Sequence, residues 1–587
     1  MPRFATPFLP LVVALYALVP VIALGQGVTT GGLTGTVRSN SSTETRFLVG
    51  ATIRCVHEPT GAIYGAVVRS NGQYSIRGMR SGGPYTVTAT YVGFDKYVAR
   101  DVSISVGETQ TLNIIMREAS TLAQEVVVTA FGDNVFDKSK TGIGSVISNE
   151  MITAAPTINR SISDMARMNP YANQSQTAGS DGLQGLSVAG VNSRFNNFQV
   201  DGAVANDLFS LSNAGTAGGQ ANANMISLDA IEELRVNVSP FDVRQSGFTG
   251  GLINAITRGG TNQFKGSVFV FGRNQDFVGL SPDANRLPFE QFSDFQFGGR
   301  IGGPIVENTL LFHITAEARQ RMTPIEVGLN DPRALNSFPA SQFVLRDIDS
   351  VARTRWGYDA GGFDRFAAKN NTINLTARLD WNISEDHKIQ LRHNFTQAVQ
   401  DRNVVRDARR FSMASNGNEF TSINNQTVLQ LNSILGDALS NEFRVSFTQT
   451  SDERMLTTRP FPEVRVQVAS GINVTLGPER NSQANALDQQ QLALTNDFTM
   501  FLGDHTVTVG THNELSWFNN LFIPDFYGSY QFASVEDFRL GTPNHYRVSY
   551  ANTDVTGGEL RPRPQWRLFQ LGGYVNDEWK IGSHLRL

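Results

Sequence analysis

The stretch of sequence that decides the fold reads Gly250-Gly251-Leu252-Ile253-Asn254-Ala255-Ile256-Thr257-Arg258-Gly259-Gly260-Thr261-Asn262. It sets a short apolar segment between two pairs of glycines. Glycine lets a backbone lie close against a neighbouring surface and permits positive φ at turns. Gly247 to Gly251 does not form Gly-x-Gly-x-x-Gly, and no Gly-Lys-Ser/Thr closes a phosphate loop. A nucleotide site is therefore not indicated.

Downstream of this stretch, apolar and polar residues alternate in repeated runs. Phe312, Ile314, Ala316 and Ala318 share one face, and His313, Thr315, Glu317 and Arg319 share the other. The same pattern recurs in Ile373–Trp381, Phe443–Thr448 and Val507–Trp517. Runs of about 9–11 residues with one apolar face have the dimensions of membrane-spanning strands. Charged residues on the polar face (Glu317, Arg378, Asp380) and aromatics near strand ends (Trp381, Trp517, Trp579) favour a barrel over a soluble β protein, which also alternates.

Turn and loop lengths also fit a barrel. Ser384–His387 and Gly503–Asp504 are short enough for periplasmic turns, whereas 324–372, 399–425 and 451–490 are long and polar, as expected of external loops. About a dozen candidate strands precede Leu587, whereas the larger outer-membrane barrels can have about 22. Because an open sheet edge cannot face lipid, we expect residues 263–587 to be the N-terminal part of an incomplete barrel.

The N-terminal region predicts an exported protein with a small β-sandwich. Arg3, the apolar run Phe8–Leu24 and the small residues Ala23 and Gly25 indicate a signal peptide over residues 1–25. Residues 28–118 then show short alternating runs separated by turn signals. Among these signals, Asn71-Gly72 predicts a hairpin, because its turn needs positive φ.

Composition excludes several classes of function. The net charge of -4 and the pI of about 6.1 give no support for nucleic-acid binding. The one cysteine, Cys55, cannot form an intrachain disulfide, and we expect it to be a small core residue. The eight histidines form no zinc-binding pair, so a zinc peptidase is excluded and no metal is expected. We also expect no cofactor and no enzyme activity.

The segment Glu125-Val126-Val127-Val128-Thr129-Ala130 lies in a linker over residues 119–137 and has two interpretations. It is either the last strand of the sandwich or an exposed segment that adds to another protein's sheet edge. In the second case main-chain hydrogen bonds would supply the affinity. Sequence composition leaves both open.

Several motifs together resemble TonB-dependent outer-membrane receptors of the Oar-like kind. Residues 28–118 resemble a carboxypeptidase-regulatory-like domain through Val49–Ile53, Asn71–Gly78, Pro84–Val87 and Val92–Phe94. Residues 138–262 resemble the plug domain through Ile147–Ile152, the short helix Ile162–Met168, Phe198–Gly202, Ile231–Val236 and the glycine-rich stretch. The resemblance makes Glu125–Ala130 the TonB box. It makes the plug motif Asp201, Gly202, Gly250, Gly251, Asn254, Arg258 and Gly259. The run Asn213–Asn224 is either disordered or an apical loop of the plug.

The resemblance implies a mainly β protein with a signal peptide, a sandwich, an α+β plug and a partial transmembrane antiparallel barrel. Its expected function is uptake of a scarce or bulky extracellular substrate, whose identity the sequence does not give. Its expected partners are an inner-membrane TonB-type energy transducer and the lipid bilayer, with the sandwich in the periplasm. The alternative is an adhesive or structural surface barrel without transport, which has no use for Glu125–Ala130.

Overall fold

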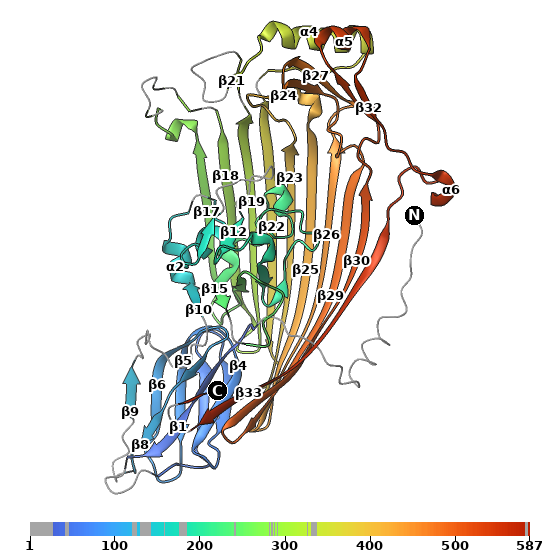
Figure 1. Ribbon diagram of the computed structural model, residues 1–587. Helices are drawn as coiled ribbons and strands as arrows, with labels where there is room; N and C mark the ends of the chain where they lie inside the picture. The colour runs from blue at the N-terminus through green and yellow to red at the C-terminus, as the bar shows by residue number, and fades with distance from the viewer. Residues whose placement is uncertain are drawn as a thin grey trace.

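The computed structural model describes residues 28–40, 46–119, 126–129, 143–157, 159–174, 185–239, 242–280, 282, 286, 288–289, 291–325, 327–329, 337–364, 366–581 and 585–586. The predicted leader lies outside these residues. Figure 1 shows a sandwich at one end, a compact domain against the concave face of a tall curved sheet, and a small subdomain at the far end of that sheet. Within the described part of the chain, no helix combines the length and apolar character needed to cross a membrane.

The N-terminal domain is a two-sheet sandwich, as predicted. Its strands are β1 (Gly31–Ser39), β2 (Thr52–His57), β3 (Ala62–Val67), β4 (Gln73–Met79), β5 (Gly82–Thr90), β6 (Tyr97–Ile104), β7 (Thr109–Thr111) and β8 (Ile114–Met116). One sheet has the order β4-β1-β7 with β8 also on β1, and the other β3-β2-β5-β6-β9. Apolar residues from both sheets, including Leu33, Ile53 and Val87, form the core between them. Cys55 belongs to this core, and burial raises the pKa of its thiol.

The prediction of a hairpin at Asn71-Gly72 is confirmed for the turn but is wrong for the strand pairing. The turn forms, with Gly72 at φ 75° and a hydrogen bond from the Arg69 amide to the Gln73 carbonyl. However, β3 pairs with β2 and β4 pairs with β1, so the strands on either side of the turn lie in different sheets. The turn residues fix the local reversal of the chain, whereas packing of the two sheets decides which strands pair.

The second domain, called here the plug because it covers the residues predicted for that domain, is α+β. Its elements are β10 (Ile143–Ser148), α2 (Asn149–Ala154), α3 (Ile162–Ala166), β11 (Ala172–Gln174), β12 (Leu186–Val188), η1 (Ser193–Phe195), β13 (Asn197–Val200), β14 (Ala203–Val204), η2 (Gly219–Ala221), η3 (Leu228–Ala230), β15 (Ile231–Ser239) and β16 (Leu252–Thr257). Five strands form one sheet in the order β10-β15-β16-β13-β14. Strand β16, from the deciding stretch, is buried at every position and lies in the middle of this sheet.

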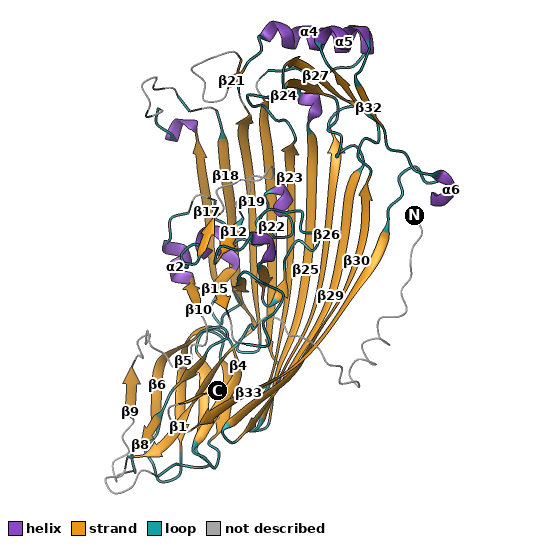
Figure 2. Ribbon diagram, viewed as in Figure 1, coloured by secondary structure: helices purple, strands orange, loops and turns teal. Residues whose placement is uncertain are grey.

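The tall sheet, called here the wall, is antiparallel. Its strands are β17 (Lys265–Asn274), β18 (Ser293–Val306), β19 (Leu310–Ile325), β22 (Phe366–Asn382), β23 (His387–Arg402), β25 (Asn418–Leu435), β26 (Leu439–Leu456), β29 (Asn485–Leu502), β30 (His505–Phe522), β33 (Gln565–Ile581) and β34 (Leu585–Arg586). They pair in chain order, as Figure 2 shows. The short turns predicted at Ser384–His387 and Gly503–Asp504 both join neighbouring wall strands at the sandwich end.

The wall buries polar side chains on one face and exposes apolar side chains on the other. On β19, His313, Thr315 and Glu317 are buried against the plug side, whereas Ile314 on the opposite face is exposed. The same holds for Ile373, Leu375 and Leu379 on β22, which are exposed while the polar residues between them are buried. A sheet that exposes apolar side chains and buries polar ones suits lipid outside and a polar interior. The predicted alternation is therefore confirmed.

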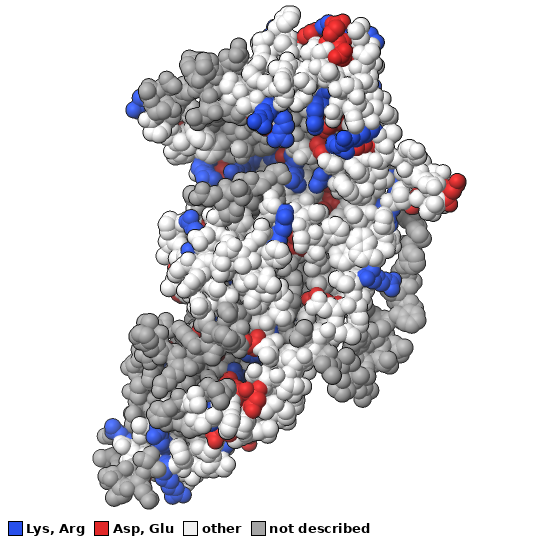
Figure 3. Space-filling view, in the orientation of Figure 1, with Lys and Arg blue, Asp and Glu red and all other residues white. Residues whose placement is uncertain are grey.

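The long segments predicted to be external loops lie at the end of the wall opposite the sandwich, but they are not simple loops. Together with the connections β17–β18 and β30–β33, they contribute the elements at this end of the wall: η4 (Gln275–Phe277), β20 (Gly328–Leu329), β21 (Ser337–Phe338), α4 (Gln342–Trp356), β24 (Arg410–Ser412), η5 (Ala414–Asn416), β27 (Glu463–Ala469), β28 (Ile472–Leu476), β31 (Ser529–Phe532), α5 (Val535–Leu540), β32 (His545–Arg547) and α6 (Thr553–Thr556). Most of them build a small external subdomain. Five strands pair in the order β24-β28-β27-β31-β32. Buried Phe338, Leu345, Phe411 and Phe538 form a core of their own. Figure 3 shows basic side chains gathered just beneath this subdomain.

Candidate functional site between plug and wall

A tight turn of the plug points Asp201 at the wall. Strands β13 and β14 are antiparallel, with Val200 opposite Ala203, and only Asp201 and Gly202 join them. Both residues have positive φ, 47° and 69°, which is the backbone of a two-residue hairpin turn. Aspartate and glycine tolerate that backbone, so the Asp-Gly pair in the sequence sets the direction of the carboxylate.

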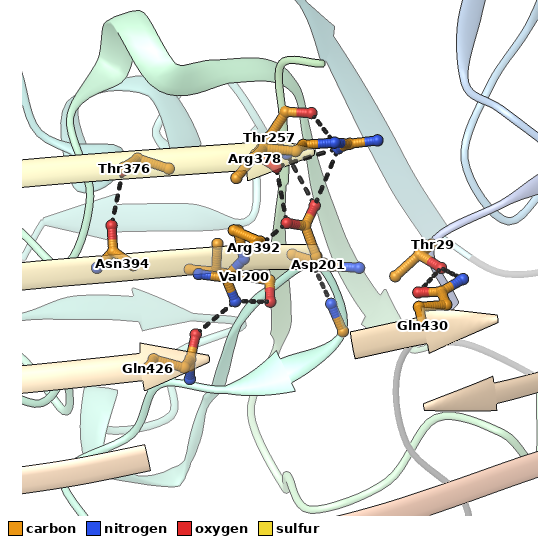
Figure 4. A network of polar contacts seen from close by, with 12 residues as sticks. Thr29, Val200, Asp201, Thr257, Thr376, Arg378, Arg392, Asn394, Gln426 and Gln430 are labelled. Atoms are coloured by element: carbon orange, nitrogen blue, oxygen red, sulfur yellow. Dashed lines mark hydrogen bonds and ion pairs between the residues drawn. The ribbon is translucent and has the colours of Figure 1, made fainter. Parts of the chain in front are cut away.

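The Asp201 carboxylate is a buried hub between plug and wall (Figure 4). It accepts hydrogen bonds from the Thr257 amide at 2.9 Å and the Thr257 hydroxyl at 2.7 Å. Its partners on the wall are Arg392 Nε at 2.8 Å and Arg378 Nη1 at 3.9 Å. Arg392 is completely buried. Its ion pair with Asp201 offsets part of the free-energy cost of removing the guanidinium from water.

Arg378 extends the network to a second plug strand and to the sandwich. Its guanidinium donates to the Thr257 carbonyl at 2.6 Å and to Asp380 at 2.7 Å. Asp380 also faces Arg80 of the sandwich, at 3.5 Å. One chain of charges therefore connects plug, wall and sandwich.

Most other plug–wall contacts are hydrogen bonds from wall side chains to plug carbonyls. The donors are Arg392 to Val200, Gln426 to Val204, Arg444 to Gly202, Asn370 to Ala221 and Asn394 to Met225, at 2.7–3.1 Å. Ser227 of the plug in turn donates to Glu317 of the wall at 2.6 Å. Water can replace each of these hydrogen bonds. Apolar plug–wall contacts are also present: Ala221 and Ala223 pack on Ala398 and Phe420 of the wall, and Phe209 packs on Phe518 and Trp566.

The glycines of the predicted plug motif are placed where a side chain would collide. A Cβ on Gly250 would meet Asn196, one on Gly251 would meet Val188, and one on Gly259 would meet the Arg80–Asp380 pair. Asn254 accepts from the Gly202 amide at 3.2 Å and donates to the Val28 carbonyl at 2.9 Å. The motif therefore joins the plug turn, the plug strand and the start of the sandwich.

Arg258 lines the same cavity as Asp201 and Arg378, but its ion pair is made with another carboxylate. Its ion pair is with Glu232 of the plug at 3.7 Å, and the cavity, of about 280 Å³, lies between plug, wall and sandwich. Sequence reasoning missed Arg392, Gln426 and Arg444, although each has the inward parity of its strand. Their alternation gives the face of the sheet, but only the folded register gives the depth at which they meet Asp201.

The segment Glu125–Ala130 is described only at Val126–Thr129, which form β9. This strand pairs in parallel with β6, with Tyr97 opposite Val126 and Arg100 opposite Thr129. It is thus the edge strand of the sandwich's larger sheet. Among the described residues, no group of three or more His, Cys, Asp or Glu side chains could hold a metal ion.

Family comparisons agree with this architecture. An outer membrane beta barrel domain matches residues 256–334 and 358–587, a carboxypeptidase regulatory-like domain matches residues 32–117, and a TonB-dependent receptor plug domain matches residues 137–252. Together they define a plugged outer-membrane β-barrel. The chain belongs to the TonB-dependent receptor family, whose members are receptors and transporters rather than enzymes, and its place is the outer membrane.

Two curated relatives and one solved structure share parts of the chain. The TonB-dependent transporter Oar of Myxococcus xanthus is 24% identical over 56% of this chain and 30% of its own length. The probable TonB-dependent siderophore receptor PirA of Acinetobacter baumannii is 25% identical over 36% of this chain and 27% of its own. The outer membrane transporter YddB of Escherichia coli has a TM-score of 0.51 at 13% identity, over 74% of this chain and 54% of that one. The chain therefore matches well under two thirds of the length of each.

Proposed function

We propose that this chain belongs to an energised importer that carries an extracellular substrate into the periplasm by moving its plug. The observation that carries the proposal is the polar character of the plug–wall contact, centred on Asp201, Arg378 and Arg392. A net hydrogen bond contributes only about 0.5–1.5 kcal/mol, because water can take its place. A contact built from such bonds can open under a pull and re-form afterwards.

The handle for that pull is proposed to be Glu125–Ala130, the TonB box. Its described part, β9, is an edge strand, and the edge away from β6 has no partner strand among the described residues. An extended segment with one open edge suits strand addition, in which backbone groups bind an incoming chain. The partner would be the periplasmic domain of a TonB-type energy transducer, with the sandwich on the same side of the membrane.

A direct test measures binding of that transducer domain to a peptide of residues 122–131. The control peptide carries Val127→Pro, because proline removes a backbone donor and resists strand pairing. Binding by the first peptide and not by the second supports the energised importer. No binding at high concentration would make β9 an ordinary strand of the sandwich and would remove the handle.

A second function, adhesion by a surface barrel, is favoured by one observation. The external subdomain has its own core and five-stranded sheet, which is more structure than a simple pore mouth needs. The two proposals separate on the transducer: an adhesin would keep its binding to cells after the Val127→Pro change, whereas an importer would stop accumulating its substrate.

A further inference from the structure

One contact that docks the sandwich on the plug uses both backbone groups of a single sandwich residue, Val106. The Val106 amide donates to Glu233 at 3.1 Å, and the Val106 carbonyl accepts from Arg235. Both partners lie on β15 of the plug sheet. The adjoining Gly107 has φ 66°, and a Cβ there would collide with the Arg235 guanidinium. The loop after β6 is thus shaped to fit the plug.

The sandwich is also docked on the wall, at the end where the turns are short (Figure 1). Arg80 faces Asp380 at 3.5 Å, and Arg77 faces Glu578 at 3.4 Å. The residues before β1 enter the gap between plug and wall, where Thr29 donates to Gln430 at 3.0 Å. Cavities of about 280 and 320 Å³ remain around these contacts. The interface is polar and loosely filled, as in domains that separate.

The docking shares a carboxylate with the plug's own hold on the wall. Asp380 binds Arg80 of the sandwich and also Arg378, whose guanidinium donates to Thr257 of the plug. When Arg80 departs, Arg378 is the remaining ion-pair partner of Asp380 among the described residues. Docking or release of the sandwich therefore changes the ion-pair partners around Arg378, which also donates to the plug.

Strand β9 ties the proposed TonB box to this docked sandwich. Its backbone pairs with β6 over four residues. The plug begins at β10, beyond residues 130–142, and a chain of that length can span roughly 40 Å when extended. The hydrogen bonds and ion pairs that dock the sandwich break when they are stretched by a few ångströms, which is much less than this length. A force applied to β9 therefore acts on the sandwich before the chain to the plug is fully extended.

We infer that the sandwich is a releasable periplasmic closure of the receptor, which leaves the wall and the plug before the plug itself moves. This inference rests on the proposed function, because it needs a partner that pulls on the box. This assigns a role to the regulatory-like domain, because the plug and the docked sandwich would then both block the periplasmic exit of the barrel. The first pull opens the outer of the two closures on the periplasmic side.

The test is single-molecule pulling on the whole receptor in lipid vesicles, with the transducer's periplasmic domain as the handle. Gly78→Cys with Asn432→Cys is designed as a disulfide lock between β4 and β25, because a Cβ on Gly78 would lie 3.8 Å from Asn432 Cβ. That spacing matches a disulfide. Gly78 has φ 69°, so the cysteine there carries some backbone strain. The reduced form should show a low-force event followed by the plug event, and the oxidised form only the plug event.

The same force trace in oxidised and reduced forms would overturn the inference. If the handle attaches to no variant while the receptor is folded, the proposed function fails instead. Arg80→Gln provides a second test without a disulfide, and it should lower the force of the first event only. Arg54→Gln, at an exposed position on β2, is the matched control and should change neither event. Equal traces for Arg80→Gln and Arg54→Gln would count against the docking role of Arg80.

Discussion

At the scale of single residues, the plug–wall contact is centred on one carboxylate between two buried arginines. Replacement of Asp201 by asparagine leaves Arg378 and Arg392 without their shared counter-charge. Loss of one partner of a buried ion pair costs about 3–5 kcal/mol. We expect hydrogen exchange of β13 and β16 to become faster in Asp201→Asn.

The matched control is Glu232→Gln, at a plug carboxylate whose side chain is 40% exposed and whose ion pair with Arg258 is long. Exposed pairs contribute about 0–1 kcal/mol, so exchange should change little. If both variants exchange alike, Asp201 is not the centre of the contact.

Glu233 makes the docking of the sandwich sensitive to pH. Burial raises the pKa of this carboxyl from 4.5 to about 7, with Glu108 and Glu232 adding to the rise and Arg235 and the Val106 amide opposing it. The protonated carboxyl is the form that the docked state favours. The contribution of Glu233 to the stability of the docked sandwich is therefore complete below pH 4.5 and is lost as the pH rises through about 7. At about 1.4 kcal/mol per pKa unit, the loss is roughly 3 kcal/mol.

Glu233→Gln keeps an acceptor for the Val106 amide and removes the titration. We expect hydrogen-exchange protection of Val106 to fall between pH 5 and pH 8 in the native protein, relative to Glu233→Gln measured at each pH. A constant ratio across that range would show that Glu233 does not titrate at the contact.

At the scale of elements, the sequence predicts which face of a strand a residue lies on better than it predicts which residue of another element it contacts. Period-2 alternation correctly places Glu317, Arg378 and Asp380 inside the wall, because alternation is a local property of a strand. It does not give the register, so the meeting of Arg392 with Asp201, some 190 residues apart, could not be read from it. The external subdomain was missed because its strands, such as β27 and β28, are short segments inside stretches that are polar on average.

The outward face of the wall carries its own prediction. Leu429 lies near the middle of β25 and is exposed, whereas Glu419 lies near the external end of the same strand. Arginine on a lipid-facing position costs about 2–4 kcal/mol at the bilayer midplane and about 0–1 near its surface. Leu429→Arg should therefore lower the urea midpoint of the receptor in vesicles much more than Glu419→Arg. Equal shifts would mean that this face does not meet lipid.

At the scale of the whole molecule, the sandwich should unfold before the wall, and the chain carries its own probes for both. The only cysteine, Cys55, is buried in the sandwich core, while all five tryptophans lie in the wall and the external subdomain. In a bilayer, wall strands cannot leave their partners without exposing backbone groups to lipid. The sandwich has no such protection. We expect a thiol reagent to label Cys55 at a lower urea concentration than the one that changes tryptophan emission.

Trp566 alone needs a correction in that experiment, because its ring lies 5.9 Å from Phe209 of the plug and senses plug release. A Trp566→Phe background removes this signal and leaves four tryptophans that report on the wall and the external subdomain. Coincident midpoints in that background would mean that sandwich and wall unfold as one unit. A sandwich that stayed bound until the wall itself gave way could not serve as a closure released by a pull, so this measurement also bears on how the receptor opens.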